Sequence, residues 1–443
     1  MNPLTQQIQN ATSKALERVD LYLKRKKNPS ESPCKKPKHN FERAKWGEPL
    51  TDLFLNSNST ECIRCCKLET QLKENQIHSS ELQVALAQEK QKNSELQRKL
   101  CDSERMRKLI HNHFLETKGS IRVFCRVKPT ENSYISLPDP NLKETKLLTL
   151  TKNQTSSSFY FDKVFGTHTT QEEIFYELSE LIQTALDGEH VCIFSYGQTG
   201  SGKTYTMEGG QGDSEGILPR AAKMIFTEIE RQQNYCTLEV FVSCIEIYLD
   251  NPRDLLGDSD LKLRVNKDKL VVEGLNRYKV STPNELIDLI GQSCEKRQTR
   301  ETHLNSRSSR SHTIYQIAIE GSTLEFQTVK GKISLIDLAG SERSNPDTYS
   351  NKTSTQIETM KAVQNEAKYI NTSLSCLRRV IADLVQRTKG VSAVPPFRET
   401  KLTRILQESL NQGKVAVIIT VSPDNYYETK ESLKFGSQAQ MFK

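Results

Sequence analysis

Residues 197–204 read Gly-Gln-Thr-Gly-Ser-Gly-Lys-Thr and directly follow an apolar run that begins at Val191. This is the complete P-loop pattern in the strand-to-helix setting that it requires. Its glycines let backbone N–H groups curl around phosphate oxygens, and the helix that follows points its positive end at the same anion. The chain must therefore contain a nucleotide-binding α/β unit, with Lys203 at the outer phosphates and Thr204 at Mg²⁺.

A second apolar run supplies the carboxylate that such a site needs. Residues 332–337 end in Asp337, which a core strand would deliver next to the metal. Gly340 follows three residues later and can offer an N–H group to the terminal phosphate. Asp337 could merely cap a strand, but a complete P-loop elsewhere in the chain favours the metal site.

A third candidate segment is polar. Residues 305–312 read Asn-Ser-Arg-Ser-Ser-Arg-Ser-His. Alone it would be an ordinary loop. Beside a P-loop, its hydroxyl groups and Arg310 could sense a γ-phosphate.

The pattern of apolar and polar residues changes at Gly119. Beyond it, short apolar runs alternate with helical patterns up to residue 443. The runs lie at 121–127, 191–196, 238–248, 313–320, 332–337 and 415–421. Several lack polar alternation, as strands covered on both faces do. We expect one α/β domain over residues 119–443.

Residues 61–118 contain neither proline nor glycine and predict one long helix. Apolar residues recur every 14 positions in two sets spaced as d and a positions are: Leu68, Leu82, Leu96 and Ile110, with Leu72, Leu86, Leu100 and Phe114. Between them lie polar layers, including Ser103 with Arg107. This half-apolar seam predicts a homo- or heterodimer through residues 68–114; the alternative is a single charged helix.

Residues 1–60 have the composition of a basic, largely disordered tail. The formal net charge of the chain is +7, and residues 24–38 alone carry seven Lys or Arg and one Glu. Such an arm suits a polyanion. Its two lysine clusters also have the spacing of a nuclear import signal; a solvated linker is the alternative. Ser32 precedes a proline and suits a proline-directed kinase.

Composition argues against several other classes. The sequence has no run of 18 apolar residues, which a membrane-spanning helix would need, and its first residues lack the pattern of a secretory signal. We therefore expect an intracellular protein. The cluster of Cys62, Cys65 and Cys66 lacks a second ligand pair and does not predict zinc. Single cysteines such as Cys192, Cys244 and Cys376 are expected to be buried.

Taken together, these motifs resemble the kinesin superfamily over about residues 119–440. Residues 194–204 resemble its first nucleotide motif, 305–312 its switch I, and 337–343 its switch II. The likeness continues through 369–375 and 397–404. It implies a kinesin-type P-loop motor domain: a central, mostly parallel sheet with helices on both faces, ATP and Mg²⁺ as ligands, and microtubules as partner. The last two motifs disfavour a non-motor P-loop ATPase.

The resemblance also implies roles for single residues. Arg310 and Glu342 would form a salt bridge that closes over the γ-phosphate, with Asn305, Ser308 and Gly340 near the attacking water. Thr204 and Ser309 would hold Mg²⁺, and Asp337 would reach it through water. The nucleotide would contact Gln198, Thr199, Gly200, Ser201, Gly202, Lys203, Thr204, Tyr205, Arg126 and Pro129.

Microtubule contacts are implied for a set of cations in the last two motifs and the helix after Asn371. They are Arg378, Arg379, Arg398, Lys401 and Arg404. The tubulin surface is acidic, so cations help to capture and orient a motor.

The order of the parts implies direction. A helix that runs straight into residues 119–126 resembles the neck of C-terminal-motor kinesins (kinesin family fourteen), which move toward minus ends. No lever follows the last expected helix, which agrees with that class. We expect a minus-end-directed motor that slides or crosslinks spindle microtubules, located in the cytoplasm, on the cytoskeleton and, through the tail, in the nucleus.

One feature departs from the family. Between Arg343 and Asn371 lie 27 residues, where the family has a shorter segment richer in glycine. This segment carries the phosphate state to the microtubule-binding helix. The alternative function is therefore a microtubule crosslinker with weak or uncoupled ATPase activity.

Overall fold

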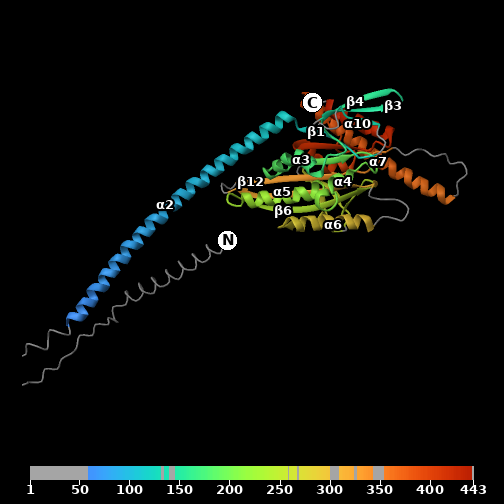
Figure 1. Ribbon diagram of the computed structural model, residues 1–443. Coiled ribbons are helices and arrows are strands. Elements are labelled where there is room, and N and C mark those ends of the chain that lie inside the picture. The colour runs from blue at the N-terminus through green and yellow to red at the C-terminus, as the bar shows by residue number, and fades with distance from the viewer. Residues whose placement is uncertain are drawn as a thin grey trace, which may run out of the picture. The chain divides into compact units, whose positions relative to one another are not determined.

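The computed structural model describes residues 58–130, 134–138, 145–257, 259–266, 269–299, 309–323, 327–342 and 354–441 (Figure 1). The expected tail, with its basic stretch and Ser32, lies outside these ranges, as do Asn305 and Ser308. The side chains of Cys62, Cys65 and Cys66 also lie outside the described part.

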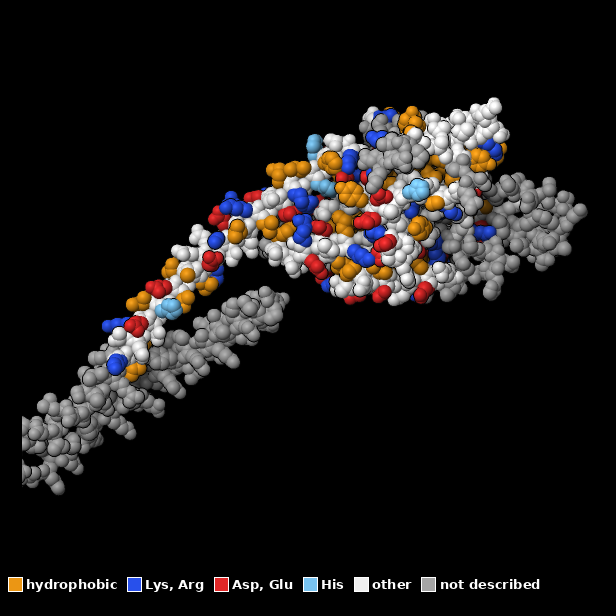
Figure 2. All heavy atoms as spheres, viewed as in Figure 1, with side chains coloured by type: hydrophobic (Ala, Val, Ile, Leu, Met, Phe, Trp, Pro, Cys, Tyr) orange, Lys and Arg blue, Asp and Glu red, His pale blue; other side chains and the backbone are white. Residues whose placement is uncertain are grey.

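The first described element is the long helix α2, Asn58–Lys118, which confirms the helix expected from residue 61 to 118. It ends where Gly119 takes a φ of 90°, a left-handed conformation that glycine adopts without strain. All eight seam residues, Leu68 to Phe114, are exposed in the single chain, from 39% at Leu100 to 63% at Ile110. Figure 2 shows hydrophobic and charged side chains interspersed along this helix. Across the described ranges, every helix is too short or too polar to cross a bilayer.

A large sheet forms the centre of the domain that follows α2, and the middle of the sheet is parallel. Its central strands lie in the order β12 (Thr328–Asp337), β5 (His190–Tyr196), β13 (Lys414–Val421), β1 (Ile121–Val127) and β4 (Thr155–Phe165). All neighbours in this group pair in parallel. The expected mostly parallel core is confirmed.

Antiparallel strands extend the sheet on both sides. One flank holds β11 (His312–Thr323), β6 (Cys236–Tyr248), β10 (Tyr278–Val280) and β7 (Asn251–Asp254). The other holds β3 (Thr145–Lys152) and β2 (Ile135–Ser136), and a separate hairpin consists of β8 (Lys262–Asn266) and β9 (Lys269–Glu273). The apolar runs predicted β1, β5, β6, β11, β12 and β13. They missed β4 of the parallel centre, the flanking strands β2, β3, β7 and β10, and the hairpin strands β8 and β9.

Helices cover both faces of the sheet, as expected (Figure 1). One core holds residues of α7 (Ser354–Thr388), α8 (Lys401–Ile405), α9 (Gln407–Gln412) and α10 (Tyr426–Met441). The other holds residues of α3 (Gln171–Leu186), α4 (Lys203–Met207), α5 (Ile217–Gln232) and α6 (Pro283–Thr299). A short 3-10 turn, η1 (Gly212–Ser214), precedes α5.

Strand β5 explains why its sequence lacks polar alternation. Cys192, Phe194 and Tyr196 enter one core, whereas Val191 and Ile193 enter the other. Both faces of this strand are buried, so both sets of alternating side chains are apolar. Cys192, Cys244 and Cys376 are fully buried, which confirms their expected role as small core residues.

The long segment between Arg343 and Asn371 is partly helical. Helix α7 begins at Ser354, well before Asn371. Much of the length that departs from the family pattern therefore extends the helix that follows the second switch.

Candidate functional site

The P-loop sits at the carboxyl end of the central strands, between β5 and α4. Gly202 caps α4 with a φ of 100°, which an L side chain rarely adopts. At Gly197, an added Cβ would lie 2.1 Å from the carbonyl oxygen of Thr420 on the neighbouring strand. The two glycines are therefore required, one for its backbone angle and the other for its close packing.

Lys203 is folded back onto this loop. Its Nζ donates to the carbonyl oxygens of Gly197 at 3.0 Å and Gln198 at 2.9 Å. Burial lowers the pKa of Lys203, against the raising effect of Asp337 and Glu342. An ammonium held so close to the loop lies where it can neutralise phosphate oxygens.

Thr204 and Asp337 come together as the sequence predicted. The Oγ1 of Thr204 donates to Oδ2 of Asp337 at 2.7 Å. Asp337 ends β12 directly beside Ser195 of β5, so the parallel register carries the carboxylate to the start of the P-loop. Oxygen ligands from a hydroxyl and a carboxylate, completed by nucleotide phosphates, suit Mg²⁺. Within the described residues there is no cluster of three or more His, Cys, Asp and Glu that could hold a metal by itself.

Asp337 also meets a cation that the sequence did not single out. Nη1 of Arg297, at the end of α6, lies 3.3 Å from Oδ2 of Asp337. The same guanidinium donates to the Ser311 carbonyl at 3.1 Å. Burial works against the charge, but Asp337, Tyr315 and Glu208 together outweigh it and the pKa of Arg297 is raised. Arg297 thus ties the metal-side carboxylate to the start of β11.

The two switch segments contact each other through the backbone. The Gly340 N–H donates to the Ser309 carbonyl at 2.8 Å. We expected this N–H to face the terminal phosphate; here it joins switch I to switch II. A Cβ at Gly340 would lie 2.3 Å from the Glu342 carboxylate and 2.4 Å from the Thr199 hydroxyl, so a larger residue here would displace the contact between them.

Arg310 and Glu342 have separate partners in this structure. Glu342 accepts from the Thr199 N–H at 2.8 Å and from its hydroxyl at 2.5 Å. Arg310 forms an ion pair with Glu366 of α7. Tyr248 donates to the same carboxylate. The partner that the sequence assigned to Arg310 is thus bound to the P-loop, and α7 supplies another.

His312 links the switches to α7. Its Nδ1 accepts from the Ala339 N–H at 3.1 Å, so its Nε2 carries the hydrogen and meets the Ser373 hydroxyl at 2.7 Å. Burial and the charges of Arg297 and Lys203 lower the pKa of His312 to about 3. The neutral ring forms a bridge from switch II to the middle of α7.

On the other side of the P-loop lie Arg126, Pro129 and Tyr205, which are also expected to contact the nucleotide. Arg126 donates to Thr206 at 2.8 Å and to Gln171 at 3.0 Å, and its guanidinium lies 5.0 Å from the Tyr205 ring centroid. Lys128, beside Pro129, donates to the Gly200 carbonyl at 2.9 Å. Gln171 was missed, because its position at the start of α3 indicates only a helix end.

The cations expected at the microtubule divide into two groups. Arg379 and Arg398 are exposed, and Lys401 and Arg404 are half-buried on α8. Arg378 instead turns inward: it donates to the Tyr196 hydroxyl, and its guanidinium lies 5.2 Å from the Tyr196 ring and 5.4 Å from that of Phe435. Arg378 is thus half-buried and held against these two rings, and its contact with microtubules stays a prediction.

Comparison with known proteins agrees with this geometry. The profile of the kinesin motor domain matches residues 77–442. The chain belongs to the kinesin superfamily. The matched range begins inside α2, and kinesin motor domains are ATP hydrolases.

The relatives of this kinesin include C-terminal motors. Carboxy-terminal kinesin 2 of Xenopus laevis is 39% identical over 368 residues, which cover 76% of this chain and 55% of the relative. Kinesin-like protein KIN-14N of Oryza sativa subsp. japonica is 38% identical over 352 residues, covering 74% and 44%. The chain thus spans about half the length of these two curated relatives.

A solved structure of a related motor has the same fold. The C-terminal motor and motor homology domain of Kar3Vik1, fused to a synthetic heterodimeric coiled coil, aligns with a TM-score of 0.67 at 31% identity. The alignment covers 86% of this chain and 98% of that chain. The kinesin fold and its similarity to kinesin family fourteen therefore rest on sequence and structure together.

Proposed function

We propose that this chain is a microtubule-stimulated ATPase motor that moves toward microtubule minus ends. The observation that carries this proposal is the double contact of α7 with the nucleotide site. Glu366 of α7 holds Arg310, and Ser373 of α7 meets His312. A helix that carries the exposed Arg379 and contacts switch I twice, with His312 leading on to switch II, can couple the two ligands.

Hydrolysis would use the residues gathered at the P-loop. The loop N–H groups and Lys203 bind the phosphates, and Thr204, Ser309 and, through water, Asp337 hold Mg²⁺. A Mg²⁺ ion held by these residues would neutralise charge on the outer phosphates. Arg310 leaves Glu366 and pairs with Glu342 when a γ-phosphate is bound, which positions water with Asn305 and Ser308. Positioning and charge stabilisation are most of what phosphoryl transfer requires.

Microtubule binding would use Arg379, Arg398, Lys401 and Arg404. The backbone N–H of Lys401 donates to Asp250 at 2.8 Å, which anchors the start of α8 to the turn between β6 and β7. The cationic surface is thus attached to the end of β6. Strand β6 pairs with β11, and β11 begins at His312. Acidic tubulin would be captured by this surface.

The remaining parts would make the motor a crosslinker as well. The exposed seam of α2 supports a dimer, and the Kar3Vik1 motor and motor homology domain were solved together, fused to a synthetic heterodimeric coiled coil. The basic tail would bind a second microtubule or a cargo, under control of Ser32, in the cytoplasm, on the spindle or in the nucleus. Tail affinity for microtubules that is unchanged by Ser32→Glu would exclude that control.

The test is steady-state ATP hydrolysis by the whole chain, with and without taxol-stabilised microtubules. Strong stimulation that is lost in Arg310→Ala and kept in Arg231→Ala, an exposed arginine far from the switches, is expected. Tight microtubule binding without stimulation would instead favour the uncoupled crosslinker. Gliding of polarity-marked microtubules then reads the direction, and plus-end motion would refute the minus-end assignment.

A further inference from the structure

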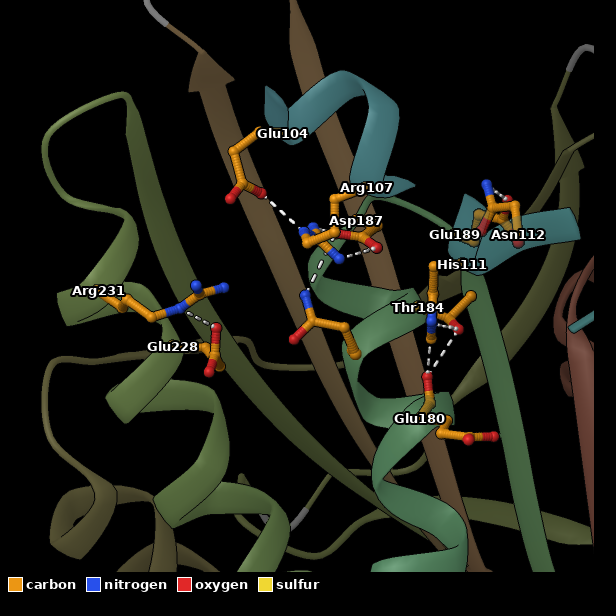
Figure 3. Close-up of polar contacts among 11 residues, drawn as sticks. Glu104, Arg107, His111, Asn112, Glu180, Thr184, Asp187, Glu189, Glu228 and Arg231 are labelled. Carbon is orange, nitrogen blue, oxygen red and sulfur yellow. Dashed lines mark hydrogen bonds and ion pairs between the residues drawn. The ribbon is translucent and has the colours of Figure 1, made fainter. Parts of the chain in front are cut away.

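The last turns of α2 are docked on the motor domain that follows it, here called the head, at the end of α3 (Figure 3). Arg107 donates to Asp187 through Nη2 at 2.5 Å and Nη1 at 3.2 Å. Asn112 donates to Glu189 at 2.9 Å, and Lys118 to Glu180 at 2.8 Å. These polar contacts surround Leu115, which is only 1% exposed. This end of the helix is therefore docked onto its own head.

Asp187 depends strongly on this contact. Its side chain is 1% exposed, and it occupies the C-cap of α3, where the negative end of the helix dipole disfavours a carboxylate. The cation that compensates it is Arg107, with a further hydrogen bond from Gln183 at 3.3 Å. A buried carboxylate at this end of a helix needs a positive partner.

Arg107 also belongs to the dimer seam. Arg107 occupies an a position of the heptad repeat. Its polar layer lies between one apolar layer formed by Leu96 and Leu100 and another formed by Ile110 and Phe114. Ile110 and Phe114 stay 63% and 46% exposed while the helix is docked. The docked face and the seam thus lie side by side on α2, and Arg107 is common to both.

In a parallel two-stranded coil of this chain with a second copy, the two Arg107 side chains would face each other across the seam. Like charges in such a layer oppose closure. Glu104 of the same helix lies 2.7 Å from Nε of Arg107, and Asp187 adds a second carboxylate from outside the coil.

We propose that Asp187 makes closure of the seam between two copies of this chain, over residues 96–114, conditional on docking of α2 to the head. Docking adds Asp187 to the Glu104 carboxylate beside each Arg107 and permits the last layers to close. Undocking leaves each guanidinium with Glu104 alone in a layer of two facing cations, and the layers open. This inference rests on the proposed dimer. Linkage requires the reverse effect as well: closure of the seam must strengthen docking by the same factor.

Sedimentation equilibrium of the whole chain measures the effect. Asp187→Asn is expected to raise the dimer dissociation constant at least about fivefold, the lower end of usual coupling strengths. Adding Arg107→Leu to Asp187→Asn should restore the dissociation constant to the wild-type value or below, because the seam layer becomes apolar. A carboxylate that only stabilised α3 would not be rescued in this way.

The matched control is Glu177→Gln, which removes another α3 carboxylate, one that pairs with Lys163 of β4. It should leave the dissociation constant unchanged. Raising the salt concentration should tighten the Asp187→Asn dimer, because salt screens the facing cations. An Asp187→Asn dimer as tight as wild type, or one not rescued by Arg107→Leu, overturns the proposal.

ATP hydrolysis on the same samples separates this proposal from the motor function. Basal hydrolysis equal to wild type shows that the heads remain folded, since Asp187 lies outside the nucleotide site. A chain that hydrolyses ATP but stays monomeric, in wild type and in the double variant alike, refutes the coupling and leaves the motor function standing.

Discussion

Nη1 of Arg297 lies 3.3 Å from Oδ2 of Asp337, and the two side chains are only 4% and 1% exposed. The pair joins the end of α6 to the end of β12, next to the Thr204 hydroxyl. Removing one member of a buried pair leaves the other charge without compensation.

Arg297→Ala should therefore lower the free energy of unfolding by about 3–5 kcal/mol. Urea unfolding followed by circular dichroism measures this loss. The control is Arg231→Ala: Arg231 is 54% exposed and pairs with Glu228 on the surface, so its loss should cost under about 1 kcal/mol. Equal losses of unfolding free energy in the two variants would show that the buried pair stabilises the fold no more than the surface pair does.

His312 predicts a dependence of stability on pH. Its pKa is lowered from its ordinary value of 6.5 to about 3, since burial and two nearby cations disfavour the charged ring. Between these two pH values the unfolded chain binds the proton and the folded chain does not. Stability is thus complete above pH 6.5 and is lost as pH falls toward 3.

At pH 5 this group alone should cost about 2 kcal/mol of unfolding free energy relative to pH 8. His312→Gln should flatten that part of the pH profile, because Gln can accept from Ala339 and donate to Ser373 without titrating. His113→Gln, on the 82% exposed side chain of another histidine, serves as the control. An unchanged profile in His312→Gln would rule this assignment out.

The ion pair between Glu366 and Arg310 is expected to slow the chemical step of ATP hydrolysis. Glu366 holds Arg310 away from Glu342, in a pair that is 22% and 18% exposed. Glu366→Gln should speed single-turnover ATP hydrolysis about fivefold, the factor that corresponds to about 1 kcal/mol in a two-state equilibrium.

Rapid-quench measurements without microtubules read this rate. Tyr248→Phe is the matched control, because it removes the other hydrogen bond to Glu366 and keeps the charge. It should change the rate much less. A slower chemical step in Glu366→Gln would mean that Glu366 supports the closed switch rather than opposing it.

The sequence predicted most of the sheet and the heart of the site for one reason. Central strands such as β5 are buried on both faces, and their carboxyl ends converge, so apolar runs ending in Gly197 and Asp337 define strand and site together. The flanking strand β3 has no such signal, because its residues alternate between core and solvent and its neighbours are rich in Ser and Thr.

Residues that act through the tertiary fold were harder to foresee. Arg297 is 40 positions from Asp337 along the chain, and only the packing of α6 brings them together. Glu366 lies in a segment that departs from the family pattern, so no motif pointed to it. Arg378 and Arg379 are adjacent cations on one helix, and the sequence cannot tell which of them faces the core.

That difference between the two arginines gives the last prediction. Arg378→Ala should leave microtubule affinity nearly unchanged and lower stability, because its guanidinium packs on the buried Tyr196 and on Phe435. Arg398→Ala should weaken microtubule binding about two- to fivefold at low salt, as the loss of one exposed charge contact does. Co-sedimentation at two salt concentrations checks both, since the Arg398 effect should shrink as salt screens the charge. If Arg378→Ala weakened binding with the same salt dependence, Arg378 would have to leave its inward position when the motor meets the microtubule.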